Sequence, residues 1–161
     1  MIKPSRLQPG DTVAAISLSS GAAAAFPGRF SAGKRQIEST FGLRVIETPH
    51  ALRSDAWLYA NPQARADDLH WALQNPDVSG IVSVIGGDES VRILPFVDPE
   101  LIRAHPKVFM GFSDATVTLT AFLNAGVVAF NGPAVMTDLA ENGGIRPFVR
   151  DSIRRVLFDA E

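Results

Sequence analysis

Short apolar runs alternate about five times with helix-like stretches along this chain of 161 residues. The runs occupy residues 12–17, 43–46, 79–85, 107–110 and 127–130. Strands that alternate with helices form parallel sheets, because each crossover helix carries the chain back to the same end of the sheet. The sequence therefore predicts a three-layer α/β domain, Rossmann-like or flavodoxin-like, whose parallel sheet is covered by helices on both faces.

Helical periodicity and breaker residues place the expected helices between these runs. We expect helices over residues 29–41, 62–74, 89–95, 99–104 and 146–158, and a further helix after Ser113. The four alanines at 22–25 fit either a helix or a loop of small residues, which Pro27-Gly28 would end. Residues 47–61 show no clear period and are expected to be a connection.

The length fits one domain, and the composition is that of an ordinary globular protein, with 46% hydrophobic and 20% charged residues. A formal net charge of −2 gives no reason to expect nucleic acid or an acidic membrane as partner. The absence of cysteine excludes disulfides, thiolate metal sites and a cysteine nucleophile. No apolar run reaches membrane-spanning length and the polar start does not look like a secretory signal, so we expect a cytoplasmic protein.

Three glycine-bearing corners are expected at the carboxyl ends of the strands, where ligands bind in sheets of this kind. They are Gly86-Gly87-Asp88, Gly111 to Asp114, and Asn131-Gly132-Pro133. The diglycine fits either a simple turn or a place where backbone N–H groups face a developing anion. It belongs neither to a G-x-G-x-x-G dinucleotide pattern nor to a P-loop.

The corner at Gly111-Phe112-Ser113-Asp114 carries the most chemical information. An apolar run precedes it and a helix-like stretch follows it, which is the layout that exposes a serine hydroxyl on a sharp turn after a strand. Ser113 would then be a nucleophile, and the N–H of the next residue would help to hold an oxyanion. The alternative is that Ser113-Asp114 only caps the following helix, because the pattern lacks the second glycine of the G-x-S-x-G elbow.

The remaining polar residues offer weaker candidates. His50, His70 and His105 lie far apart and none is followed by a metal-ligand partner three or four residues later in the chain. Asp67-Asp68 falls on the polar side of a predicted helix and is expected to be solvated. We therefore expect that neither a metal nor an organic cofactor is needed.

The motifs together resemble a known family. Residues 85–95, Ile-Gly-Gly-Asp-Glu-Ser-Val-Arg-Ile-Leu-Pro, and residues 107–116, Lys-Val-Phe-Met-Gly-Phe-Ser-Asp-Ala-Thr, look like the LD-carboxypeptidase family of serine peptidases. Leu7 to Asp11 and Arg65 to Leu69 are similar too, so the resemblance spans nearly the whole chain. Murein-cleaving members tend to carry an aromatic residue and Gly after the diglycine. Asp88-Glu89 departs from this and is closer to the microcin C immunity branch.

The resemblance implies roles for residues at two corners. Ser113 would be the nucleophile, with the backbone N–H groups of Asp114, Gly87 and Gly86 as oxyanion donors. The other two triad members of the family, a Glu and a His, lie in a C-terminal domain. No His follows His105 here, and Glu141 lacks the family's context. Residues 1–161 are therefore expected to be the nucleophile-bearing N-terminal domain of a two-domain serine peptidase, with an incomplete triad.

The same resemblance implies a function for the complete protein. It would cleave an amide at the carboxyl side of a small peptide or a peptidyl-nucleotide, through an acyl-enzyme, as in peptidoglycan processing or microcin resistance. It would act as a homodimer in the cytoplasm without a metal or cofactor, and the isolated chain would be nearly inactive. The alternative is a non-catalytic ligand-binding or interaction domain that keeps the fold. Phe112, Val135 and Met136 are candidates either for a surface that docks the second domain or for the core.

Overall fold

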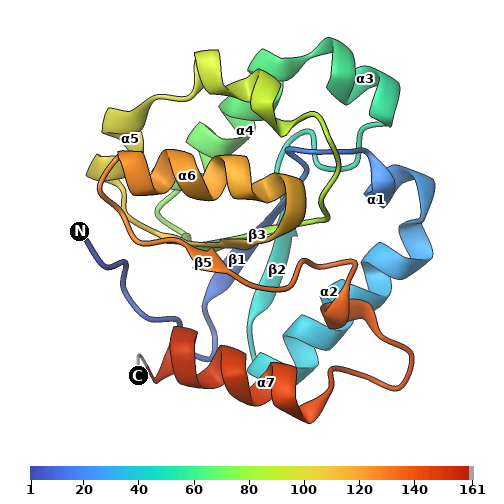
Figure 1. The fold of residues 1–161 in the computed structure, drawn as a ribbon. Coiled ribbons are helices and arrows are strands. Elements are labelled where there is room, and N and C mark those ends of the chain that lie inside the picture. Colours follow the sequence, from blue (N-terminus) through green and yellow to red (C-terminus); the bar gives the residue numbers. More distant parts are fainter. Residues whose placement is uncertain (160–161) are drawn as a thin grey trace.

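The computed structural model describes residues 1–159. Its centre is a five-stranded, fully parallel sheet with the strand order β2-β1-β3-β4-β5 (Figure 1). The strands are β1 (Thr12–Ile16), β2 (Arg44–Glu47), β3 (Val78–Ser83), β4 (Val108–Gly111) and β5 (Phe130–Asn131). This order is flavodoxin-like, and the chain reverses its direction of winding between β1 and β3. The fold class predicted from the sequence is confirmed.

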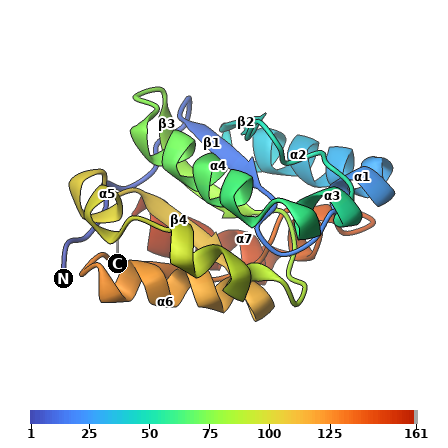
Figure 2. The ribbon, with the colours of Figure 1, turned by 90° about the horizontal axis from the view of Figure 1, so that it is seen from above.

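Helices cover both faces of the sheet (Figure 2). One layer holds α2 (Pro27–Phe41) and α7 (Pro147–Ile153); the other holds α4 (Pro62–Gln74), α5 (Pro99–Ala104) and α6 (Thr116–Asn124). Two short helices, α1 (Ala22–Ala25) and α3 (Asp55–Ala60), lie at the carboxyl end of the sheet. The remaining helical segments are the 3-10 helices η1 (Ser90–Phe96), η2 (Ser113–Ala115) and η3 (Asp138–Ala140), and the π-type turn η4 (Arg154–Phe158).

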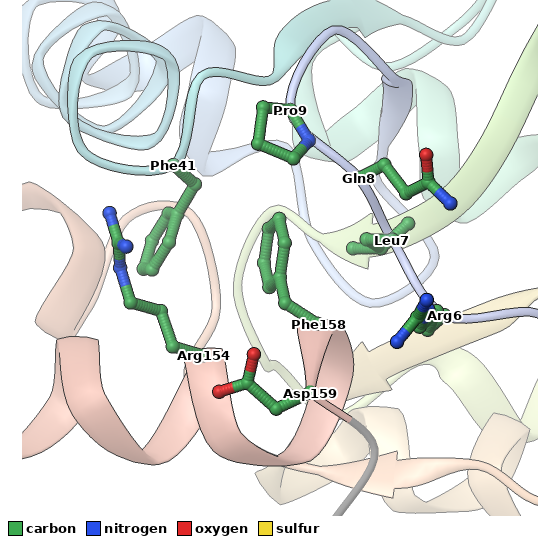
Figure 3. Close-up of a pocket in the computed structure, with 8 residues that line it drawn as sticks. All are labelled: Arg6, Leu7, Gln8, Pro9, Phe41, Arg154, Phe158 and Asp159. Carbon is green, nitrogen blue, oxygen red and sulfur yellow. The ribbon is translucent and has the colours of Figure 1, made fainter.

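The first and last segments of the domain meet at the amino end of the sheet (Figure 3). The N–H of Leu7 donates to the carbonyl of Leu157 at 2.8 Å, and the ring of Phe41 stacks on that of Phe158 with centroids 5.7 Å apart. A cavity of about 400 Å³ lies beside this stack, and Arg6 and Arg154 contribute to its wall. Apolar contacts therefore tie α2, η4 and the N-terminal segment together.

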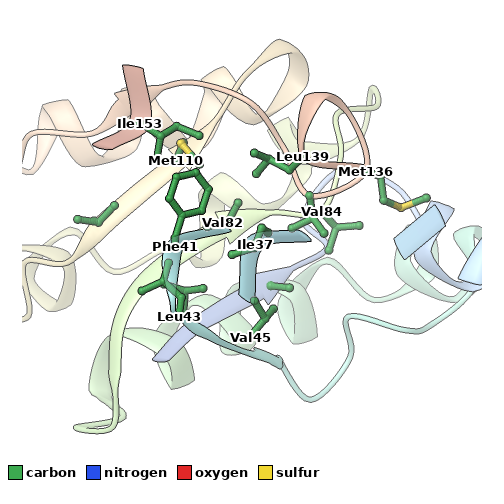
Figure 4. Packing of buried hydrophobic residues seen from close by; sticks show 14 of the residues in the cluster. Ile37, Phe41, Leu43, Val45, Val82, Val84, Met110, Met136, Leu139 and Ile153 are labelled. Carbon is green, nitrogen blue, oxygen red and sulfur yellow. The ribbon is translucent and has the colours of Figure 1, made fainter. Parts of the chain in front are cut away.

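Strand residues alternate between the two layers, as the pleat requires. Val13, Val82 and Met110 point into the cluster under α2 and α7, part of which Figure 4 shows. Their chain neighbours Ala14, Ile81 and Phe109 point into the cluster under α4, α5 and α6. Central strands buried on both faces read as continuous apolar runs, which is why the sequence revealed them.

Most predicted elements are found, and three differ. The helix expected at 62–74 is α4, with the same bounds. Residues 47–61 contain α3, whose single short turn buries only Leu58 and shows no period in the sequence. The helix expected over 29–41 begins two residues earlier, at Pro27, since proline at the first helical position needs no N–H partner. The run at 127–130 yields only the short β5, at the sheet edge.

Candidate active site

Ser113 lies on a strained turn directly after β4. It has a φ of 61°, and it is the only residue other than glycine with positive φ among those the structure describes. This left-handed conformation costs an L-residue with a side chain roughly 1–2 kcal/mol. The side chain is exposed, and β4 leads into it through the buried Gly111. The predicted corner is therefore present, with a serine held in a conformation that local energetics disfavour.

The capping interpretation of Ser113 does not fit this geometry. The residue in the cap position of η2 is Phe112, and neither η2 nor α6 receives a hydrogen bond from a capping side chain. Asp114 also has another use, because its Oδ2 accepts the backbone N–H of Ser90 at 2.9 Å. The hydroxyl of Ser90 in turn donates to the carbonyl of Asp114 at 2.7 Å. Asp114 is thus held by η1 rather than serving the helix that follows it.

Gly86 packs against the Ser113 hydroxyl. A methyl group on Gly86 would lie 2.9 Å from Cβ and 3.0 Å from Oγ of Ser113, and 3.5 Å from the backbone N of Asp114. Only a residue without a side chain allows this approach. The backbone of the diglycine therefore lies beside both the hydroxyl and the following N–H group. This is the neighbourhood that an oxyanion site requires.

The other side of the diglycine rests on the loop after β1. A methyl group on Gly87 would lie 2.7 Å from the carbonyl oxygen of Ser19, and the hydroxyl of Ser20 donates to the carbonyl of Gly86 at 2.9 Å. The loops after β1 and β3 flank the point where the winding direction reverses, which is where ligands enter such sheets. A cavity of about 380 Å³ lies here, and its wall includes Ser20, Tyr59 and Asp88.

Two polar side chains of α4 are more deeply buried than their sequence suggests. Arg65 is 1% exposed and donates to the backbone carbonyls of Leu18 and Glu89. Asp68 is 2% exposed, so the expectation of a solvated Asp67-Asp68 pair is wrong for Asp68. The helical pattern placed Asp68 on the polar side, and no local signal shows that a loop covers that side.

Asp68 holds a histidine at the far side of the carboxyl end. It accepts a hydrogen bond from Thr48 Oγ1 at 2.7 Å and lies 2.7 Å from Nδ1 of His50, whose ring stacks on Trp57. An Asp-oriented imidazole is a common general base. However, His50 follows β2, and two strands separate β2 from β4. At about 4.8 Å per strand, the two loops start roughly 14 Å apart, so His50 does not reach Ser113.

The other two histidines lie elsewhere. His70 accepts the backbone N–H of Asp98 at 3.1 Å, and His105 precedes β4, at the end of the strand opposite Ser113. Glu141 pairs with Arg29 at 3.2 Å. Within residues 1–159 no histidine lies at the Ser113 corner. The structure thus brings together Ser113, Asp114, Gly86 and Gly87 and leaves them without a neighbouring imidazole.

Several other expectations concern surfaces and ligands. Of the two places left open for Val135 and Met136, the structure selects the core, since they are 0% and 2% exposed, whereas Phe112 is half-buried. Among the described residues, no three or more His, Asp or Glu side chains are grouped so that they could hold a metal ion. In the same part of the chain, no helix combines the length and the apolar character that crossing a membrane requires.

Comparisons with known proteins give a consistent result. The family described as the LD-carboxypeptidase N-terminal domain matches residues 13–132. The chain is 30% identical over 149 residues to the microcin C7 self-immunity protein MccF of Escherichia coli, which covers 92% of the chain and 43% of MccF. It is 31% identical over 160 residues to the Bacillus subtilis protein named "Probable murein peptide carboxypeptidase", covering 99% of the chain and 49% of that protein.

The fold agrees with solved structures. MccF without ligand superposes with a TM-score of 0.90 at 28% identity, covering 98% of the chain and 47% of MccF. Other MccF structures hold adenosine monophosphate or aspartyl sulfamoyl adenosine. The chain spans less than half the length of these relatives. A family match across most of the sequence, together with the shared fold, shows that the chain belongs to the LD-carboxypeptidase N-terminal domain family.

Proposed function

We propose that this chain is the nucleophile-bearing N-terminal domain of a two-domain serine carboxypeptidase. Ser113 is the nucleophile, and the backbone N–H groups of Asp114 and Gly87, with Gly86 beside them, hold the oxyanion. The observation that carries the proposal is the left-handed conformation of the exposed Ser113 against Gly86. Strain of this kind persists where the surrounding structure requires it, and it is concentrated at functional sites.

The proposed reaction is acyl transfer in two steps. Ser113 Oγ attacks the carbonyl carbon of the scissile amide and gives its proton to a base. The tetrahedral oxyanion is held by backbone N–H groups, and the amine leaves after it receives that proton. Water then hydrolyses the ester, which releases the acid and restores the serine.

The base and its orienting carboxylate are proposed to come from a second domain. None of the histidines in residues 1–159 lies at the Ser113 corner, and the relatives are about twice as long as this chain. A serine hydroxyl without a base is a weak nucleophile at neutral pH. Removing a triad member typically lowers kcat by about 10⁴-fold or more. The 161-residue chain alone is therefore expected to be nearly inactive.

The proposed substrates are small peptides or peptidyl-nucleotides. MccF structures hold nucleotide-like ligands, and other relatives are named as murein peptide carboxypeptidases. The open cavity after β1 and β3 would receive part of such a substrate. The family likeness also underlies the proposal of a cytoplasmic homodimer that needs no metal or cofactor.

Covalent labelling tests the nucleophile directly. We expect a fluorophosphonate to modify the 161-residue chain slowly and at Ser113 only, as followed by mass spectrometry of the intact protein and its peptides. Ser113→Ala removes the labelling, whereas Ser39→Ala, which changes an exposed serine of α2, leaves the rate unchanged. Persistent labelling of Ser113→Ala would overturn the assignment.

Cleavage assays separate the proposal from its alternative, a non-catalytic ligand-binding domain. The absence of an imidazole at the corner is the observation that favours this alternative. The two-domain protein is expected to release an amino acid from a murein tetrapeptide or the nucleotide part from a microcin-type aminoacyl nucleotide. Loss of both activities in Ser113→Ala supports the peptidase. Binding of these compounds without cleavage, with equal affinity for Ser113→Ala, supports the alternative.

A further inference from the structure

Arg65 is a buried cation without a carboxylate partner. It is 1% exposed, and none of the ion pairs found in residues 1–159 includes it. Its Nη1 donates to the carbonyl of Leu18 at 2.7 Å and to that of Glu89 at 3.2 Å, while Nε and Nη2 have no partner among the described residues. Burying a guanidinium costs several kcal/mol, so its position calls for an explanation.

The two carbonyls belong to different loops at the proposed site. Leu18 lies in the loop after β1, and Glu89 is the second residue after the diglycine Gly86-Gly87. Arg65 therefore links the loop after β1 to the loop after β3, close in sequence to the diglycine. The hydroxyl of Ser20 adds a second bond across the same gap, to the carbonyl of Gly86.

Two more hydrogen bonds connect the diglycine loop to the residue that follows the nucleophile. Ser90 follows Glu89 directly and donates two hydrogen bonds to Asp114, the residue after Ser113. Burial lowers the pKa of Arg65, whereas the nearby carboxylates of Glu89 and Asp114 raise it. The guanidinium thus lies within electrostatic reach of the corner, and a run of contacts leads from α4 to the Asp114 backbone.

We propose that Arg65 is a positioning residue that holds the diglycine backbone in place to receive the oxyanion. The inference rests on the proposed function, because it assigns a task within that site. Arg65 does not touch the reacting atoms. It acts through the carbonyls of Leu18 and Glu89, which fix where the N–H groups of Gly86 and Gly87 point. A misplacement of about 1 Å in such a site costs on the order of 100-fold in rate.

A second cation that binds α4 offers a matched control. Lys107, which precedes β4 and is partly buried, also donates to two backbone carbonyls, those of Ala72 and Asn75, at 2.9 and 2.5 Å. These bonds lie at the C-terminal end of α4, far along the helix from Arg65. Lys107→Met therefore removes a comparable pair of bonds without touching the loops at Ser113. A purely structural role for Arg65 predicts that the two variants behave alike.

The first measurement is the rate at which a fluorophosphonate labels Ser113 in the 161-residue chain, below the unfolding temperature of each variant. We expect Arg65→Met to lower this rate about 10- to 100-fold. Arg65→Lys, which keeps the charge but loses the planar fork, should recover part of it. Lys107→Met should stay within about twofold of the parent, since its bonds do not reach the diglycine. Equal rates for Arg65→Met and Lys107→Met would overturn the inference.

The second measurement needs no reactive serine. Amide hydrogen exchange and chemical shifts of Gly86, Gly87 and Asp114 report whether the oxyanion backbone has moved. We expect faster exchange and shifted signals at these amides in Arg65→Lys and no change in Lys107→Met. Unchanged signals would overturn the inference even where labelling falls. Altered signals in a chain whose Ser113 is never labelled would support the role of Arg65 in the loop and count against the proposed function alone.

Discussion

At the amino end of the sheet, large apolar side chains close the fold, whereas at the carboxyl end small and polar residues do so. Phe41 and Phe158 stack beside the N-terminal segment at the first end (Figure 3). At the second end, Gly86 lies against a strained serine, and a buried guanidinium and two serine hydroxyls bind backbone carbonyls. Apolar packing tolerates small shifts, but a set of directed hydrogen bonds does not.

Stability and reactivity therefore depend mainly on different parts of the domain. A residue at the amino end should affect how readily the chain unfolds and leave the chemistry of the folded molecule alone. A residue at the carboxyl end should affect mainly the reactivity of Ser113. Four changes test that division, in decreasing order of expected size.

Truncation of Phe41 is expected to give the largest loss of stability. Phe41→Ala removes a ring that is 4% exposed and leaves Phe158 without its stacking partner, for a loss of about 3–5 kcal/mol in the free energy of unfolding. Denaturant titration measures this loss. The labelling rate of Ser113, taken below the unfolding transition, should match that of the parent. A parallel fall in labelling would show that the two ends are coupled.

A methyl group on Gly86 should have the opposite effect, lowering the reactivity of Ser113 rather than the stability of the fold. It would lie 3.0 Å from Ser113 Oγ and displace either the hydroxyl or the diglycine. We expect Gly86→Ala to lower the labelling rate by about 100-fold. Gly28→Ala is the control, since a methyl group at this exposed position of α2 meets nothing within 4 Å. A reactive Gly86→Ala would argue against the close approach seen here.

The strain at Ser113 predicts a gain in stability when the side chain is removed entirely. Glycine adopts a φ of 61° without the penalty that any Cβ carries there. Ser113→Gly should therefore be about 1 kcal/mol more stable than Ser113→Ala, while neither reacts with the phosphonate. Thermal unfolding of the two variants measures the difference. A less stable glycine variant would mean that Ser113 is not held in the left-handed region.

The smallest effect is expected at an exposed ion pair. Arg150 Nε donates to Asp151 Oδ1 at 2.7 Å, and this hydrogen bond lowers the pKa of Asp151 from its ordinary 3.8. Any stabilisation is present above pH 3.8 and is lost as the pH falls through the lowered pKa. Because both groups are exposed, solvent screens the pair. Arg150→Ala should leave the unfolding midpoint unchanged within error at pH 7 and at pH 3. A shift at pH 7 alone would show that the pair matters.

Much of the fold could be predicted from local sequence patterns, because these patterns reflect which residues are buried. The central strands are buried on both faces, so Val82, Ile81 and Phe109 appear as uninterrupted apolar runs. Gly42 ends α2 with a φ of 68°, as a glycine after a helix commonly does. Glycines that end apolar runs also placed Ser113 after one strand and the diglycine after the neighbouring strand. The roles assigned to these residues stay predictions.

Other features depend on which segments meet in space. Nothing near Arg65 or Asp68 in the sequence indicates burial, because the groups that bind them come from the segments after β1 and β2 and from the diglycine loop. The bonds between Ser90 and Asp114 join residues 24 positions apart. The sequence left Val135 and Met136 open between a docking surface and the core, and the fold places them in the core.

The order of strands and helices along the chain, the glycine corners and the family can all be read from the sequence alone, since each is encoded in a short stretch of residues. The strain at Ser113, the approach of Gly86 to its hydroxyl and the link that Arg65 makes between two loops become visible only in the folded chain. This is because periodicity reports on the environment of one segment at a time. Strain and burial of polar groups arise only where separate segments are pressed together, and their cost is met by the packing of the whole domain.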